Sequence, residues 1–147
     1  MGQKKVVEKK AEETKEIESK SVAKSALAKK YKNVENVRIY INSTYNNTII
    51  TVTDLNGNVL TWASAGSLGF SGPKKATPFA ASKVASVIAE KIKPLEIKNM
   101  EIYVKGIGAG RDSAIRSLAE AGFNIVLLKD VTPIPYNGPR PPKVRRV

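Results

Sequence analysis

Between positions 105 and 116 the chain reads Lys105-Gly106-Ile107-Gly108-Ala109-Gly110-Arg111-Asp112-Ser113-Ala114-Ile115-Arg116. Before this stretch, apolar and polar residues alternate over residues 100–104, which is typical of a strand with one apolar face. After it, Gly122 stands where a glycine commonly ends a helix, and the apolar residues form one helical stripe of Ala114, Ile115, Leu118 and Ala119. The three glycines are therefore predicted to form a turn between a strand and a helix.

Two roles fit the glycines of this loop. Glycine has no Cβ, so the backbone can take positive φ and approach another molecule closely. The amide groups at the start of the following helix, with Arg111 and Arg116 beside them, favour an anion such as phosphate. Under this hypothesis a side chain at Gly110 blocks the phosphate without unfolding the domain. The alternative is that the glycines only make a tight turn between the strand and the helix.

Two common phosphate-binding signatures do not match this loop. A P-loop requires Lys and then Ser or Thr after its second glycine, whereas Arg111 and Asp112 follow Gly110. A dinucleotide fingerprint requires its third glycine three residues after the second. That position holds Arg111 or Ser113, depending on the glycine from which the count begins. The sequence therefore does not assign the loop to either class of nucleotide-binding protein.

The composition favours a polyanionic partner and disfavours catalysis. The chain has 147 residues and a net charge of +12, which suits one domain that binds nucleic acid or, as a second choice, an anionic membrane. No apolar run approaches the length of a membrane span, and none resembles a signal segment. Cysteine and histidine are both absent from the sequence. Thiolate ligands and the commonest general base are therefore missing, and we expect no enzyme activity, no metal and no cofactor.

The composition divides the chain into three parts. Residues 1–33 are rich in lysine and glutamate, and we expect a flexible extension that attracts phosphates or only improves solubility. Residues 34–131 contain the periodic apolar segments of a folded α/β domain. Residues 132–147 contain five prolines and no acid, and their cations are Arg140, Lys143, Arg145 and Arg146. This tail is predicted to be extended and to lie along phosphates, or to be disordered without a partner.

Three strands and two turns are predicted at the start of the domain. The strand patterns cover residues 37–42, 49–54 and 59–63, and the Asn56-Gly57 pair is typical of a hairpin turn. A polar loop joins the first two strands. Its predicted RNA contacts are Asn42, Ser43, Thr44, Tyr45, Asn46 and Asn47. Tyr45 can stack on an unpaired base, or it can pack on the sheet as a loop anchor.

A helix and two further strands, one of them the strand before the glycine loop, complete the sheet. Thr77 and Pro78 are typical of a helix N-terminus, and Pro94 ends that helix. Its buried stripe is predicted to be Ala81, Val84, Ala85, Ile88, Ala89 and Ile92. The last strand, residues 123–128, is a nearly continuous apolar run that indicates burial on both faces. The predicted order is β-β-β-α-β-α-β, an α/β domain with one mixed five-stranded sheet and helices packed on it.

Several motifs of the chain together resemble a known family. They are Asn46-Asn47-Thr48-Ile49, Trp62-Ala63-Ser64-Ala65-Gly66, Thr77-Pro78-Phe79-Ala80-Ala81, the glycine loop with Arg111, Ala114, Ile115 and Arg116, and the tail segment 130–138. With these motifs, residues 34–147 closely resemble the universal small-subunit ribosomal protein eleven family in its bacterial form. The positions that depart from the usual pattern are Ser71, Pro73, Ile107 and Tyr136. Ser71 stands where a basic residue is usual, and this weakens the interpretation of loop 66–76 as an RNA contact at that one position.

The resemblance implies a non-enzymatic structural protein of the cytoplasmic ribosome. It implies a ribonuclease-H-like sheet on the platform of the small subunit, where the protein bridges ribosomal RNA helices. It also implies small-subunit proteins seven and eighteen as neighbours, and a tail near the messenger RNA exit, the Shine-Dalgarno helix and initiation factor three. Nucleases of this fold hold metal with clustered carboxylates, but the first strand offers Arg38, Tyr40 and Asn42. The fold is therefore expected without the nuclease chemistry.

Beyond the polar loop, the predicted ribosomal RNA contacts follow the glycine-rich and basic segments. They are Lys74, Lys75, Thr77, Lys105, Gly106, Gly108, Gly110, Arg111, Arg116, Asn137, Arg140, Lys143, Arg145 and Arg146. An alternative function is a free-standing module for single-stranded RNA, which needs exposed aromatic rings on a sheet face. Tyr40 and Tyr103 are the candidates for such rings.

Overall fold

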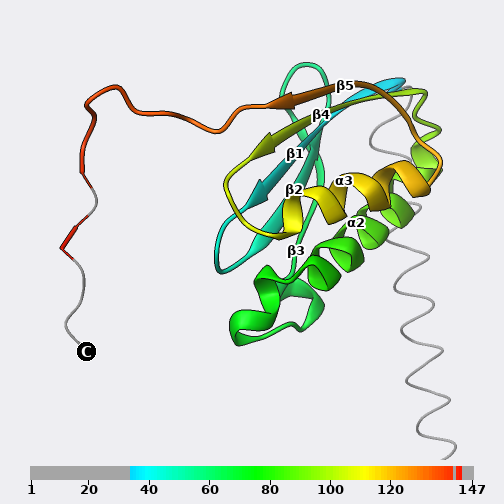
Figure 1. The fold of residues 1–147 in the computed structure, drawn as a ribbon. Coiled ribbons are helices and arrows are strands. Elements are labelled where there is room, and N and C mark those ends of the chain that lie inside the picture. Colours follow the sequence, from blue (N-terminus) through cyan, green and yellow to red (C-terminus); the bar gives the residue numbers. More distant parts are fainter. Residues whose placement is uncertain (1–33, 141, 144–147) are drawn as a thin grey trace, which may run out of the picture.

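The computed structural model describes residues 34–140 and 142–143 (Figure 1). A five-stranded mixed sheet has the strand order β3-β2-β1-β4-β5. Its strands are β1 (Asn36–Ser43), β2 (Thr48–Thr53), β3 (Val59–Ser64), β4 (Asn99–Lys105) and β5 (Asn124–Asp130). The helices α2 (Pro78–Ile92) and α3 (Gly110–Glu120) lie side by side on one face of this sheet. Within the described residues, the predicted order of strands and α-helices is confirmed.

The first three strands form an antiparallel meander, as predicted. The Asn56-Gly57 turn between β2 and β3 is held by Asp54, whose carboxylate accepts hydrogen bonds from the backbone and the side chain of Asn58, both at 2.8 Å. The bond from the Asn58 side chain is the main reason why the pKa of Asp54 is lowered. Gly57 takes a φ of +90°, which a residue with a Cβ rarely adopts.

The apolar positions of the strands and helices form one core between the sheet and the helices. β1 and β4 pair in parallel, and their inward-facing residues form adjacent buried rows: Val37, Ile39 and Ile41, and Met100, Ile102 and Val104. The whole predicted stripe of α2 is buried against this layer. Burial of these aliphatic side chains stabilises the domain by roughly 25 cal/mol for each Å² of apolar surface removed from water.

The two ends of α2 follow the sequence signals. The Thr77 hydroxyl oxygen accepts a hydrogen bond from the Ala80 backbone N–H at 3.3 Å, and Pro78 is the first helical residue. This cap supplies a partner for one of the amide groups that the first helical turn leaves without one. The helix ends at Ile92, just before Pro94, which cannot donate a helical hydrogen bond.

The second helix also ends as predicted, but it buries a narrower stripe. Gly122 takes a φ of +86° and donates its N–H to the Ala119 carbonyl at 3.1 Å. Ala114 and Leu118 are fully buried and Ile115 is half-buried. Ala119, the fourth residue of the apolar stripe, is exposed. The helix turns this residue away from the sheet because only part of its circumference contacts the core.

The position of β5 in the sheet also differs from the prediction. Its apolar run predicted a strand buried on both faces, but β5 is an edge strand whose neighbour is β4. Val126, Leu127 and Leu128 are exposed, and the exposed fraction of Val126 is 63%. The core consists of residues from the other strands and the helices, and Ile125 is only partly buried against it. Within the described residues, no further layer covers this edge, so an apolar run does not guarantee a central strand.

The tail leaves the domain after β5. Residues 132–140 and 142–143 contain no helix or strand, and the tail extends away from the sheet (Figure 1). The prolines of this segment restrict φ and cannot donate backbone hydrogen bonds, which favours an extended backbone. The N-terminal extension of residues 1–33 lies outside the described residues, and so do Arg145 and Arg146.

Candidate nucleic-acid interface

Several loops meet where β1 and β4 end. Because these two strands are parallel, their carboxyl ends lie at the same edge of the sheet, where Asn42 pairs with Lys105. The loop 44–47 follows β1, and the glycine loop 106–109 follows β4. The hydroxyl of Thr132, at the start of the tail, accepts a hydrogen bond from Gly106 N–H at 3.1 Å. We call residues 42–47, 105–111 and 132 the carboxyl edge.

The loop 44–47 is closed by its own hydrogen bonds. The Thr44 hydroxyl donates to the Asn47 carbonyl and accepts from the Asn47 N–H, both at 3.1 Å. The Asn47 side-chain oxygen in turn accepts from the Thr48 N–H at 3.0 Å. Tyr45 remains outside this arrangement and is 74% exposed, so the interpretation of Tyr45 as an anchor packed on the sheet is wrong. Its ring is accessible to a ligand.

Ser43, one of the predicted RNA contacts, is fully buried. It is 0% exposed, and its hydroxyl oxygen lies 3.5 Å from the hydroxyl oxygen of buried Thr48. The glycine loop covers Ser43, because the Gly108 N–H donates to the Ser43 carbonyl at 3.0 Å. The Ser43 side chain is therefore inaccessible to a phosphate in this conformation, and its contact with RNA stays a prediction. Ser43 instead holds the glycine loop against β1.

The glycines of the loop are required by packing inside the domain. A Cβ at Gly106 would overlap the Ser43 carbonyl oxygen, and a Cβ at Gly108 would overlap the Ser43 hydroxyl and the Thr44 carbonyl. Gly106 also takes a φ of +99°. Since Gly106 and Gly108 donate their N–H groups to Thr132 and Ser43, these two amides are not free for a phosphate. The tight-turn interpretation therefore accounts for these two glycines, and their contact with RNA stays a prediction.

Arg111 joins the glycine loop to the end of β5. Its Nη1 donates to the Gly106 carbonyl at 2.6 Å, and its Nη2 forms an ion pair with the Asp130 carboxylate. Asp130 also accepts from Thr132, from the backbone N–H at 2.9 Å and from the hydroxyl at 2.6 Å. We call Gly106, Arg111, Asp130 and Thr132 the tail-root network. Arg111 thus has a structural role at this edge. Its predicted contact with RNA would use the same guanidinium group that binds Gly106 and Asp130.

The tail-root network lowers the pKa of Asp130. The hydrogen bond from the Thr132 side chain is the largest cause, the bond from Arg111 follows, and together with the Thr132 backbone they bring the pKa of Asp130 to about 2. The carboxylate is therefore charged at neutral pH, which favours the ion pair with Arg111. The root of the tail is held to the glycine loop by a charged group.

The remaining predicted contacts differ in how close they lie to the carboxyl edge. Thr77 mainly caps α2, whose first turn lies close to the start of α3, because a Cβ at Gly110 would lie 2.8 Å from the Ala81 Cβ. Lys74 is exposed and Lys75 partly so, on a short 3-10 helix that precedes α2 (Gly72–Ala76). The exposed candidates farther along α3 and the tail are Arg116, Asn137, Arg140 and Lys143. The structure thus brings together the two loops, Lys105, Arg111 and the tail root, but not all of the cations.

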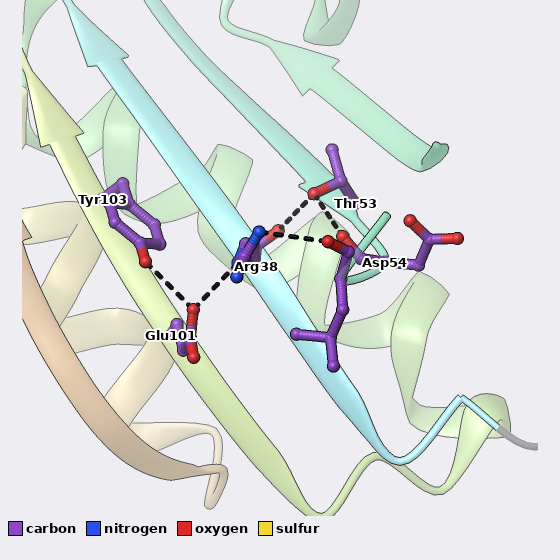
Figure 2. Close-up of polar contacts among 6 residues, drawn as sticks. Arg38, Thr53, Asp54, Glu101 and Tyr103 are labelled. Carbon is purple, nitrogen blue, oxygen red and sulfur yellow. Dashed lines mark hydrogen bonds and ion pairs between the residues drawn. The ribbon is translucent and has the colours of Figure 1, made fainter. Parts of the chain in front are cut away.

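The sheet face opposite the helices carries a polar network on β1 and β4 (Figure 2). The Glu101 carboxylate accepts from Arg38 Nε at 2.9 Å and from the Tyr103 hydroxyl at 3.0 Å. The hydrogen bond from Arg38 is the main cause that lowers the pKa of Glu101, and the bond to Glu101 raises the pKa of Tyr103. Tyr103 stacks on Tyr40, with ring centroids 5.3 Å apart. Both predicted aromatic candidates therefore lie on this face.

Trp62 is a third aromatic residue of this face, and it was not among the candidates predicted from the sequence. It is 57% exposed and pairs with Thr51, which in turn pairs with Tyr40. The alternation of Trp62 with buried Ala63 is the signal that points to an outward-facing ring. Its alignment with Tyr40 follows from the register of β2 between β1 and β3, which periodicity alone does not provide.

The described residues offer side chains for binding but no cluster that suits a metal ion. They contain no group of three or more His, Cys, Asp or Glu residues that could hold a metal ion. The same part of the chain contains no helix with the length and apolar character of a membrane span. Exposed cations, amides and aromatic rings gather instead at the carboxyl edge and on the sheet face beside it.

A comparison with protein-family models identifies the chain. The model described as Ribosomal protein S11 matches residues 37–146. The match begins in β1, includes the rest of the sheet and both helices, and continues through the basic tail. It confirms the resemblance found in the motifs, and with it a place on the ribosome. Since the match covers most of the sequence, the chain belongs to the ribosomal protein S11 family, whose members are non-enzymatic proteins of the small ribosomal subunit that bind ribosomal RNA.

Proposed function

We propose that this protein binds ribosomal RNA on the platform of the small subunit and bridges RNA helices there. Its neighbours are small-subunit proteins seven and eighteen. Its tail lies near the messenger RNA exit, close to the Shine-Dalgarno helix and the site of initiation factor three. Family membership supports ribosomal RNA as the ligand. The finer placement is supported by the motifs of the chain and by the arrangement of the carboxyl edge.

The observation that carries the proposal is that an exposed polar loop and the basic tail start from one edge of the sheet. Residues 44–46 and Lys105 are exposed there, and the tail-root network holds Thr132 beside them. The cations Arg140 and Lys143 follow along the tail. Contacts with phosphates position a protein on RNA, and an exposed aromatic loop can contact unpaired bases. A loop and a tail that diverge from one edge can therefore contact two RNA helices together.

Directed cleavage of the RNA tests this placement. The chain has no cysteine, so one introduced cysteine can carry an iron chelate that cuts nearby RNA. We expect Asn46→Cys in the loop and Asn137→Cys in the tail to cut platform RNA in reconstituted small subunits. Glu90→Cys, exposed on α2, is the control and should cut these sites weakly. Equal cleavage from all three positions, or none from the loop and the tail, would contradict the proposal.

We also propose that the domain is a ribonuclease-H-like scaffold that binds without cutting. The strand order β3-β2-β1-β4-β5 supports this comparison. On the open side of β1 and β4 the acidic residue is Glu101, which pairs with Arg38. Two-metal nucleases use several carboxylates that face a common site, and one neutralised carboxylate does not supply them. The sheet is therefore suited to present side chains to RNA.

A further inference from the structure

The sheet face turned away from α2 and α3, here called the open face, carries a row of side chains that crosses every strand. Strand register places Trp62 beside Thr51, Thr51 beside Tyr40, and Tyr40 beside Tyr103. Lys129 of β5 continues the row beside Tyr103. The neighbours of these residues along β1, β2 and β4 point into the core, so the row lies on the opposite face. Three of its five members are aromatic.

The rings of this row are accessible and already arranged for stacking. Tyr40 is 39% exposed, and its ring lies nearly parallel to that of Tyr103, with an interplanar angle of 20°. Thr51 is the smaller side chain between Tyr40 and Trp62, which are two strands apart, or about 9 to 10 Å at the usual spacing of strands. A planar base can extend the tyrosine stack or lie over Thr51. The open face thus has the features of a stacking platform.

Hydrogen bonds hold part of this platform in place (Figure 2). The Tyr103 hydroxyl donates to Glu101, and Arg38 donates to the same carboxylate oxygen. The Arg38 Nη1 also donates to the Leu55 carbonyl at 3.1 Å, which ties the guanidinium to the turn after β2. A ring that is already fixed loses little conformational entropy when a ligand stacks on it.

The charge of the open face favours RNA over a protein partner. Among the described strand residues on this face, the cations are Arg38, Lys105 and Lys129, and Glu101 is the only acid. Lys105 belongs to the carboxyl edge as well, so the open face continues into the region proposed to contact ribosomal RNA. Phosphates that approach one surface are therefore close to the other.

We propose that the open face binds unpaired RNA bases, which stack on Trp62, Tyr40 and Tyr103 while Lys105 and Lys129 contact the phosphates between them. The proposal rests on the proposed function and adds a second RNA-binding surface to the carboxyl edge. Stacking tolerates any base, so this surface recognises single-stranded RNA rather than one sequence.

The fluorescence of Trp62 reports stacking directly, because it is the only tryptophan of the chain. The full-length protein is titrated with a short oligoadenylate and with an abasic oligomer of the same length and charge. We expect the oligoadenylate to quench the fluorescence and the abasic oligomer to leave it almost unchanged. Equal quenching by both oligomers, or no binding of the oligoadenylate, would overturn the proposal.

Leucine substitutions separate stacking from simple apolar contact. Tyr40→Leu and Tyr103→Leu keep apolar bulk but remove the aromatic ring, and each should weaken oligoadenylate binding by roughly 5- to 150-fold. Leu127→Ser is the control, because Leu127 is an exposed aliphatic residue of the same face. It should leave the affinity unchanged. Circular dichroism of each variant shows whether it is folded. If a variant does not fold, the titration of the wild-type protein still tests the proposal.

Incorporation into small subunits distinguishes the possible failures. Wild-type protein that does not co-sediment with small subunits would contradict the proposed function itself. Wild-type protein that incorporates but does not bind oligoadenylate would overturn only the stacking proposal. If Leu127→Ser reduces incorporation and the tyrosine variants do not, the open face docks another protein, and the proposal of RNA on this face is wrong.

Discussion

Gly110 shows that the carboxyl edge packs so closely that one position has no room for a Cβ. A Cβ at this position would lie 2.6 Å from the Thr48 hydroxyl oxygen and 2.8 Å from the Ala81 Cβ. We therefore expect Gly110→Val to lower the free energy of unfolding by about 1 to 3 kcal/mol, as overpacked substitutions do. Urea unfolding of the purified protein measures this change. The hypothesis that a side chain here only blocks a phosphate leaves out these internal contacts, although a loss of this size need not unfold the domain.

A neighbouring position provides the matched control. Ala109 belongs to the same loop but is exposed, so Ala109→Val should change the free energy of unfolding by less than about 0.5 kcal/mol. If Gly110→Val is as stable as the wild type, the loop can move away from α2, and the glycines would again need an external ligand to explain them.

A chemical prediction concerns the Asn-Gly pairs. Glycine after asparagine leaves the backbone nitrogen accessible, so it can attack the side-chain amide and form a succinimide, which opens to aspartate or isoaspartate. In the hairpin turn, the Gly57 N–H donates to the Asp54 carbonyl at 3.3 Å, which restricts this nitrogen. Asn137 and Gly138 lie in the exposed tail. We expect Asn137 to convert faster than Asn56 in aged free protein, and peptide mass spectrometry checks the order; faster conversion of Asn56 would contradict it.

At the scale of elements, sequence patterns predicted what neighbouring residues determine. The strands, the Asn56-Gly57 turn and the Thr77 cap depend on residues close in the chain, and they were found where expected. The edge position of β5 depends on which surface the helices cover, and that is a property of the whole sheet. Strand register likewise aligns Trp62 with Tyr40, and a loop hydrogen bond brings Gly108 to Ser43. The periodicity of one segment does not show which residues of other segments become its neighbours. The sequence analysis therefore did not include Trp62 among the candidates.

The tail-root network predicts a pH dependence at the end of β5. The pKa of Asp130 is lowered from 3.8 to about 2. Because the folded pKa is below the usual value, the network contributes its full stability above about pH 4 and loses it as the pH falls toward 2. We expect the Thr132 amide signal in NMR spectra to shift with a midpoint near pH 2 as the tail root is released.

Two variants test which hydrogen bonds lower the pKa of Asp130. Thr132→Val removes the strongest hydrogen bond to Asp130 and should raise its pKa toward 3.8. Arg111→Gln removes the second cause and should raise the pKa by a smaller amount. A wild-type midpoint near 3.8 would mean that the network does not form in solution.

At the scale of the whole molecule, most of the net charge comes from the two ends of the chain. Residues 1–33 carry ten lysines and five glutamates. The net charge is +12, and residues 139–147 contribute the cations Arg140, Lys143, Arg145 and Arg146. Each cation that contacts an RNA phosphate releases counterions, so binding weakens as salt rises. The tail-root network holds Asp130 and Thr132, which precede this basic segment in the chain.

Removal of residues 139–147 should therefore make the salt dependence of RNA binding shallower. The slope of log affinity against log salt concentration is negative. Its magnitude should decrease by about 0.7 to 0.9 for each phosphate that the tail no longer neutralises, or by about 3 if all the tail cations bind phosphate. A full-length variant with these cations replaced by glutamine should show the same slope, because charge rather than length sets it. Lys93→Gln, exposed at the far end of α2, should leave the slope unchanged. Equal slopes for the wild type and the truncated chain would show that the tail does not bind phosphates, and the bridging arrangement at the carboxyl edge would then lack its second RNA partner.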